Sequence, residues 1–71
     1  MSEKEFLENL GKKISKLRNT KGFSQERFAA ELDIDQSYLS EIETGKANPS
    51  ILYMKKMAGA LGLELWELLK F

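Results

Sequence analysis

The 71-residue sequence contains no cysteine and no histidine. The absence of cysteine excludes disulfide bonds and cysteine-ligated zinc. Without histidine, the chain lacks the commonest general base, nucleophile activator and metal ligand. The acidic residues are spread along helical positions, with no glycine-rich phosphate loop and no metal-ligand cluster. The sequence therefore argues against an enzyme, a metal site and a bound cofactor.

Long hydrophobic runs are also absent, so no segment is predicted to cross a membrane. The first five residues mix both charge signs and lack the apolar core of a signal peptide. We therefore expect a cytoplasmic protein. The length predicts one domain over residues 1–71. A domain of this size buries only about 60% of its unfolded surface, so it needs efficient packing or a partner.

The chain has no excess charge of either sign, with eleven basic and eleven acidic residues. This balance alone argues against a nucleic-acid binder, which usually has a basic surplus. The distribution is uneven, however. Six basic and three acidic residues give residues 1–22 a net +3, while one basic and six acidic residues give residues 23–43 a net −5. Four basic and two acidic residues give residues 44–71 a net +2, so an acidic middle lies between two mildly basic ends.

Proline and β-branched residues are scarce, and apolar residues recur every three or four positions, which predicts an all-α protein. Five helices are expected. The first covers about residues 4–20 and the last about residues 64–70. The second runs from the capping residue Ser24 to Leu32, and the third from the capping residue Asp35 to Gly45. The fourth begins at Asn48-Pro49-Ser50 and runs to about Leu61. Pro49 fits a first helical position, with Asn48 or Ser50 as the cap.

The apolar stripes of these helices define the expected core. Its members are Phe6, Leu7, Leu10, Ile14, Leu17, Phe28, Ala29, Leu32, Leu39, Ile42, Ile51, Met54, Met57, Ala58, Leu61, Leu65, Leu68 and Leu69. Short connections between the helices favour a compact all-α domain.

Residues 24–45 are the most informative stretch. Two short helices are separated by a three-residue turn, and Ala29 is small where the helices must approach closely. Ile34 is placed to fill the turn, and Leu39 and Ile42 hold the second helix against the first. These features specify a helix-turn-helix, whose second helix presents its outer face to the DNA major groove.

The spacing resembles the XRE family, the Cro and phage-repressor type of helix-turn-helix protein. The resemblance covers about residues 10–70. It is carried by Ile14, Leu17, Arg18, Gly22, Ser24, Gln25, Glu26, Ala29, Leu39, Ser40, Glu41, Ile42, Glu43, Gly45, Lys46, Asn48, Pro49, Ser50, Ala58, Ala60, Leu61, Gly62, Leu68 and Leu69. It implies a five-helix lambda-repressor-like domain that binds an operator as a homodimer.

Asp33 departs from this family pattern, because glycine is common at that turn position. Glycine is favoured where the backbone needs a positive φ, and Asp tolerates this geometry better than most residues. We expect a cost of about 1 kcal/mol and an intact fold.

The resemblance places the base-reading residues on the third predicted helix, about residues 36–43. Gln36 and Ser37 begin this helix, and a glutamine amide can bond the N6 and N7 atoms of adenine. Ser40 and Glu41 follow one turn later as weaker candidates. Glu41 could accept a hydrogen bond from cytosine N4, but it otherwise repels phosphate. The alternative for Gln36 and Ser37 is that they are two polar residues on a solvated face.

Six residues are expected to contact DNA phosphates: Ser24, Gln25, Tyr38, Thr44, Lys46 and Asn48. Gln25 lies at a helix N-terminus, which favours anions, although it could also be an ordinary surface residue. Tyr38 could bond a phosphate or only brace its helix. If two to three cations per subunit engage, a dimer should show a slope of log K against log[salt] of about −4 to −5.

Arg18 and Glu43 are expected to form a structural ion pair, because the family commonly links the first helix to the third at these positions. A partly buried pair of this kind usually serves architecture. It would also neutralise Glu43, so that this carboxylate does not repel DNA.

The C-terminal segment, residues 63–71, has more apolar side chains than one short helix can bury. Trp66, Leu69 and Phe71 are the expected dimer interface, because large exposed aromatics favour an interface. The alternative is that Trp66 folds over the fourth helix and Phe71 frays.

The leading hypothesis is a sequence-specific DNA-binding regulator that binds a palindromic operator as a homodimer, with half-sites about 10–10.5 base pairs apart. The chain resembles phage repressors and the controller proteins of restriction–modification systems. The expected partners are double-stranded DNA and a second copy, with no small-molecule effector. The alternative is a protein-interaction adaptor that uses the acidic residues 23–43 to bind a basic protein.

Overall fold

The helices lie in the order that the sequence predicts. The computed structural model describes residues 1–71 and contains no strand. Its helices are α1 (Glu3–Thr20), α2 (Gln25–Leu32), α3 (Gln36–Glu43), α4 (Ile51–Ala60) and α5 (Leu65–Leu68). The predicted all-α, five-helix fold is confirmed. α5 is shorter than predicted, because the backbone N–H of Leu69 already closes its last turn on Trp66.

Serine side chains mark the start of three helices. The Oγ atoms of Ser2, Ser24 and Ser50 accept hydrogen bonds of 3.1 Å from the backbone N–H three residues later. Ser50 is therefore the cap of α4, and Pro49 lies before this cap instead of at the first helical position. Asp35 occupies the cap position of α3, but its carboxylate makes no capping hydrogen bond.

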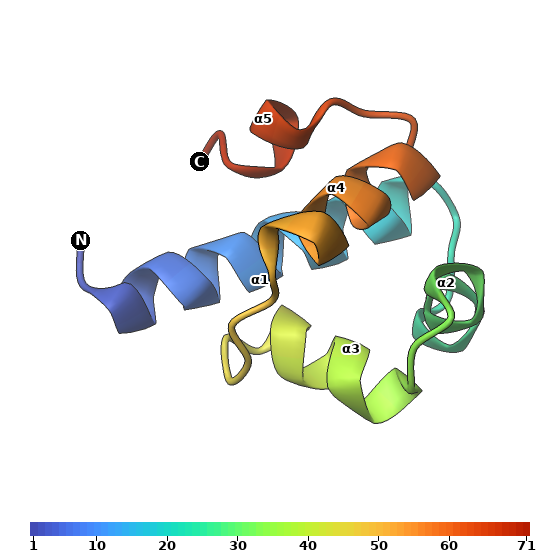
Figure 1. Ribbon diagram of the computed structural model, residues 1–71, viewed down its shortest axis with the longest axis horizontal. Helices are drawn as coiled ribbons and strands as arrows, with labels where there is room; N and C mark the ends of the chain where they lie inside the picture. Colours follow the sequence, from blue (N-terminus) through green and yellow to red (C-terminus); the bar gives the residue numbers. More distant parts are fainter.

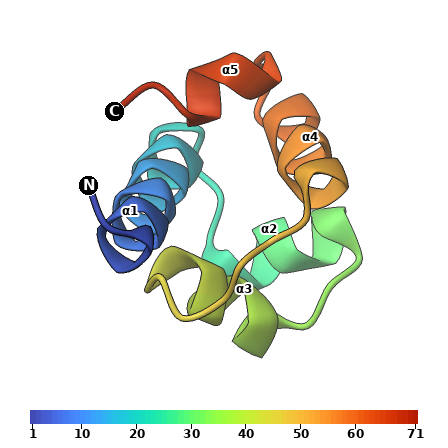
Figure 2. The ribbon, with the colours of Figure 1, turned by 60° about the vertical axis from the view of Figure 1, so that its left-hand side comes forward.

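The helices enclose one core. α1 packs against α3 and α5, α2 packs against α3 and α4, and α5 covers the ends of α1 and α4 (Figures 1 and 2). The two chain termini lie on the same side of the molecule (Figure 1). α2 and α3 form the end of the molecule that lies away from α5, so their outer surfaces are free.

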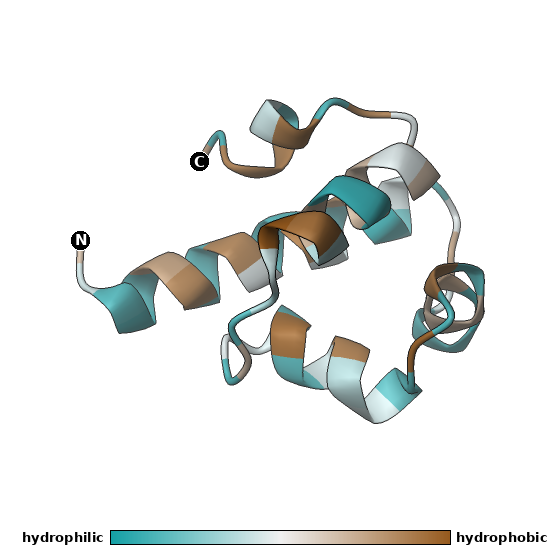
Figure 3. Cartoon of the chain, in the orientation of Figure 1, coloured by the Kyte–Doolittle hydropathy of each residue, from teal (hydrophilic) through white to brown (hydrophobic).

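Eleven apolar residues form the buried core, and all of them were expected there: Leu10, Ile14, Phe28, Ala29, Leu32, Leu39, Ile42, Met57, Ala58, Leu61 and Leu68. The prediction that Phe6 and Ile51 belong to the core was wrong, because Phe6 is 40% exposed and Ile51 is 60% exposed. Phe6 lies on the N-terminal part of α1, which extends beyond its neighbours, and Ile51 begins α4, whose first turn is an apolar band at the surface (Figures 1 and 3).

α1 approaches the end of α3 so closely that only glycine fits between them. A Cβ atom at Gly11 would lie 2.5 Å from the carbonyl oxygens of Ile42 and Glu43. Gly45 follows α3 with a φ of +77°, and a Cβ there would lie 2.8 Å from the Cα of Glu8. Backbone therefore packs on backbone at this junction, which fixes the direction of α3 relative to α1.

No helix in the structure combines the length and apolar character needed to cross a membrane.

Candidate nucleic-acid interface

The turn between α2 and α3 has the geometry that the sequence pattern requires. Asp33 adopts the left-handed conformation, with φ 57° and ψ 46°, and it is the only residue besides glycine with a positive φ. The N–H of Asp33 donates to the carbonyl of Ala30, and that of Ile34 donates to the carbonyl of Ala29. This pair of hydrogen bonds closes α2 as a Schellman motif. Ile34 is half-buried against the core, as expected.

α3 presents a polar outer face and a buried apolar face. Leu39 and Ile42 are buried, while Gln36, Ser37 and Glu41 are exposed. Ser40, the fourth predicted base-reading residue, is half-buried. Because the apolar side is fully covered, the outer face is free to lie against another surface.

Tyr38 has a packing role within the domain. Its half-buried ring meets the ring of Tyr53 on α4 edge-on, with 5.9 Å between the ring centroids. This contact links the start of α3 to α4. The geometry favours the bracing alternative for Tyr38, although a phosphate contact through its hydroxyl is compatible with the same position.

Arg18 and Glu43 form the only salt bridge in the structure. Arg18 Nε lies 2.7 Å from Glu43 Oε2, and Nη2 donates to Oε1 at 3.1 Å. The two side chains are only 10% and 5% exposed. Arg18 Nη1 also donates to the carbonyl of Phe23 at 2.8 Å. The pair therefore joins α1, the α1–α2 loop and the end of α3, and no buried side-chain polar atom is left without a partner.

Gln25 connects this pair to the outer face of α3. Its Nε2 donates to Glu43 Oε1 at 3.1 Å, and its Oε1 accepts from Gln36 Nε2 at 3.4 Å. The sequence places Gln25 at a phosphate site but does not predict either contact. Both contacts are between residues distant in sequence, so the only signal for them is the shared helix-turn-helix spacing.

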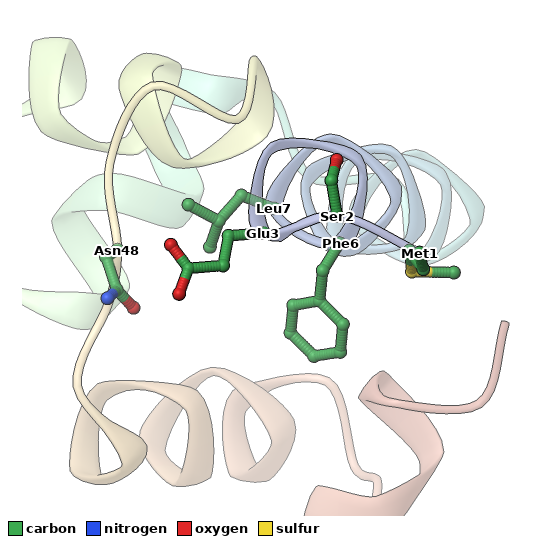
Figure 4. Close-up of a pocket in the computed structure, with 6 residues that line it drawn as sticks. All are labelled: Met1, Ser2, Glu3, Phe6, Leu7 and Asn48. Carbon is green, nitrogen blue, oxygen red and sulfur yellow. The ribbon is translucent and has the colours of Figure 1, made fainter.

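The remaining predicted phosphate residues lie at the start of α2 and after the end of α3. The hydroxyl of Ser24 caps α2, and that of Thr44 donates to the carbonyl of Ser40 at 2.9 Å. Lys46 is exposed in the loop after α3. Asn48 faces a recess beside the first turn of α1, into which Phe6 and Glu3 point (Figure 4).

The charge on the helix-turn-helix is mainly negative. Asp33, Asp35 and Glu41 are exposed around the turn and α3, where the exposed cations of the same region are Arg27 and Lys46. Other cations lie elsewhere: Lys13 and Lys70 line a recess with Trp66. These two lysines therefore do not add to the charge on α3.

The exposed apolar residues lie on other elements. Trp66 is 59% exposed and Phe71 is 46% exposed, while Leu69 is half-buried. The ring of Phe71 packs on that of Phe6, with 5.4 Å between centroids. Trp66 lines a recess with Lys13 and Leu17 of α1. Leu52, at 75% exposure, lies in another recess with residues of α4.

No three acidic side chains gather closely enough to hold a metal ion.

Comparison with known proteins supports the arrangement. A helix-turn-helix family profile matches residues 14–68. Control protein C.MunI of Mycoplasma sp. is 48% identical over 59 residues, which cover 82% of this chain and 80% of the relative.

Two solved structures are also similar. The restriction–modification controller protein C.AhdI of Aeromonas hydrophila has a TM-score of 0.84 at 39% identity, covering 87% of this chain and 94% of that one. The biofilm master regulator SinR, solved in complex with DNA and known from Bacillus subtilis, has a TM-score of 0.79 at 34% identity. That match covers 86% of this chain and 98% of the SinR chain. The relatives are regulators and controller proteins, and this chain belongs to the XRE-type helix-turn-helix family of DNA-binding transcriptional regulators.

Proposed function

We propose that the chain is a cytoplasmic, sequence-specific transcriptional regulator that binds a palindromic operator as a homodimer. The observation that carries the proposal is the outer face of α3, where Gln36, Ser37 and Glu41 are exposed on a helix whose other side is buried. A helix held in this way can enter the major groove without losing its packing. The similarity to SinR, which was solved with DNA, supports the same use of the fold.

In this arrangement the residues divide into two groups. Gln36 and Ser37 read base edges, because the N-terminal residues of a recognition helix reach furthest into the groove. Ser40 and Glu41 take secondary positions along the same helix. Ser24, Gln25, Tyr38, Thr44, Lys46 and Asn48 contact the phosphate backbone and fix the register of the protein on the duplex.

The homodimer uses Trp66, Leu69 and Phe71. This assignment is supported by the exposure of the aromatic rings of Trp66 and Phe71, because large exposed apolar side chains favour an interface. Phe6 extends the same surface from α1, because its ring packs on that of Phe71. A two-fold axis through such a surface would present two α3 helices to two half-sites about 10–10.5 base pairs apart.

The decisive experiment selects bound sequences from a randomised duplex library, using the wild type and Gln36→Ala at two salt concentrations. We expect a two-fold-related motif, and we expect Gln36→Ala to relax one symmetric pair of positions. Lys16→Ala is the matched control, since Lys16 is exposed on α1. It should leave the motif unchanged. The slope of log K against log[salt] should be about −4 to −5.

The adaptor hypothesis gives a different result. The exposed acids of the helix-turn-helix would repel DNA and attract a basic protein. If the library yields no enriched motif and only weak, steeply salt-dependent retention, base-specific recognition is excluded and the adaptor becomes the better description.

A further inference from the structure

We propose that Tyr53 is a positioning residue for DNA binding: its ring holds that of Tyr38 in the orientation in which the Tyr38 hydroxyl meets a phosphate of the operator. The inference rests on the proposed DNA-binding function and adds a residue of α4 to it. Bracing and phosphate contact then become a single role of Tyr38, because the brace fixes the direction of the hydroxyl.

The first observation is the contact between the two rings. Their centroids lie 5.9 Å apart, and their planes meet at 68°. Aromatic pairs favour this edge-to-face arrangement, which stabilises them beyond the area that they bury. Tyr38 lies in the first turn of α3 and Tyr53 in the first turn of α4, and both side chains are half-buried. The orientation of the Tyr38 ring therefore depends on a residue outside the helix-turn-helix.

The second observation concerns the two hydroxyl groups. No hydrogen bond within the domain uses either phenol oxygen, and neither oxygen is buried without a partner. The Tyr38 hydroxyl is therefore available as a donor. Tyrosine hydroxyls are among the groups that contact the phosphates of DNA, and such a contact fixes the register of a protein on the duplex.

The third observation is the recess beside the rings. Asp33, Ile34 and Asp35 line it together with Tyr38 and Tyr53. Both aspartates are exposed, and the carboxylate of Asp35 makes no capping hydrogen bond. These carboxylates can accept a hydrogen bond from a phenol. If the Tyr53 ring were removed, the Tyr38 ring would be free to turn into the recess, and its hydroxyl would bond a carboxylate instead of a phosphate.

The test replaces one symmetric pair of operator phosphates at a time by uncharged methylphosphonates and measures Kd for each duplex by fluorescence anisotropy. In the wild type, replacement of each contacted pair should weaken binding. Tyr38→Phe should weaken binding to the unmodified operator by about ten-fold, because the dimer loses two hydrogen bonds. It should also lose most of its sensitivity to replacement of one pair. Tyr53→Leu should have the same two effects, at the same pair.

Three comparisons separate positioning from a purely structural role. Tyr53→Phe keeps the ring and should bind within about two-fold of the wild type, because the edge contact remains. Leu52→Ala is the matched control, since Leu52 is 75% exposed in the same turn of α4, and it should keep the wild-type sensitivity at every pair. Adding Tyr53→Leu to Tyr38→Phe should cause no further loss.

The proposal is overturned if Tyr53→Leu keeps the wild-type sensitivity at every pair, or if Tyr53→Phe loses as much affinity as Tyr53→Leu. It is also overturned if Tyr38→Phe binds an enriched motif as tightly as the wild type does. An absent motif would instead overturn the proposed function. If Tyr53→Leu does not fold, NMR on the wild type replaces it. Nuclear Overhauser effects between the rings of Tyr38 and Tyr53 should persist in the DNA complex, and their loss on binding would exclude the positioning role.

Discussion

The junction of α1 with α3 and the surface around the chain termini are built in different ways. At the junction, Gly11 lets backbone pack on backbone, and Arg18 and Glu43 satisfy each other in a nearly closed site. Around the termini, Phe6 and Phe71 pack on each other but remain 40% and 46% exposed, and Trp66 remains 59% exposed. The first region is complete within one chain, whereas the second leaves large apolar surfaces in water.

This difference indicates that contacts within one chain fix the direction of α3, whereas a second chain could cover the exposed aromatic side chains. The direction of α3 depends on contacts inside the domain, so in the proposed homodimer each subunit would carry a preformed α3. The spacing between two such helices would depend on the exposed aromatic surface. Substitutions at the junction should therefore change folding stability, and substitutions at the surface should change assembly.

The largest effect is expected from breaking the buried ion pair. Arg18→Met leaves the carboxylate of Glu43 without its ionic partner, and the Glu43 side chain is only 5% exposed. We expect a loss of about 3–5 kcal/mol in the free energy of unfolding, measured by urea denaturation followed by circular dichroism. The double substitution Arg18→Met with Glu43→Leu removes both charges and should recover most of the loss. If Arg18→Met lowers the free energy of unfolding by less than about 1 kcal/mol, the ion pair does not hold the junction of α1 with α3 together.

The second effect tests the backbone contact between α1 and α3. In Gly11→Ala the new Cβ would meet two carbonyl oxygens at 2.5 Å, and neither can move without shifting α3. We expect a loss of about 1–3 kcal/mol by thermal denaturation. Gly59→Ala is the matched control, because a Cβ there meets nothing within 4 Å. It should stabilise α4 by about 0.5–1 kcal/mol, since alanine is the better helix former. Equal effects of both substitutions would contradict the close approach at Gly11.

The third effect concerns the surface around the termini. Trp66→Ala should weaken self-association by about 1–2 kcal/mol, or about ten-fold in the dimer Kd, measured by sedimentation equilibrium. Leu52→Ala is the control, because Leu52 is also exposed but lies in a separate recess. The folding of the monomer should change little in both variants. If Leu52→Ala weakens the dimer and Trp66→Ala does not, the interface lies at the start of α4.

The same two regions show what sequence patterns can and cannot predict. Helical periodicity identifies Leu10 and Ile14 as core because it identifies the side of α1 that faces the domain. The same periodicity wrongly includes Phe6 and Ile51, because it cannot indicate how far along a helix the neighbouring helices reach. The left-handed turn at Asp33 was predictable from the resemblance to the XRE family, because glycine is common at this position.

The polar network was only partly predictable for a related reason. The resemblance to the XRE family pairs Arg18 with Glu43, but no local pattern connects Gln25 to Glu43 or Gln36 to Gln25. Those contacts depend on the angle between α2 and α3 and on side-chain orientations set by packing. Base-reading and phosphate-contacting roles depend further on the position of DNA, which the chain alone does not define.

The smallest effect is expected at the turn between α2 and α3, where an exposed residue has a locally unfavourable backbone conformation. Asp33 has a φ of 57°. This conformation is unfavourable for a residue with a Cβ atom but not for glycine. Asp33→Gly should raise the free energy of unfolding by up to about 1 kcal/mol, although part of this gain is lost because glycine makes the unfolded chain more flexible. Asp33→Ala should instead destabilise the domain, since alanine keeps the Cβ atom and lacks a polar side chain suited to this geometry. Both variants remove the same charge, so comparing their urea midpoints separates the backbone effect from electrostatics. Equal midpoints would show that Asp33 adopts the left-handed conformation without cost, and that the family preference for glycine at this turn has another origin.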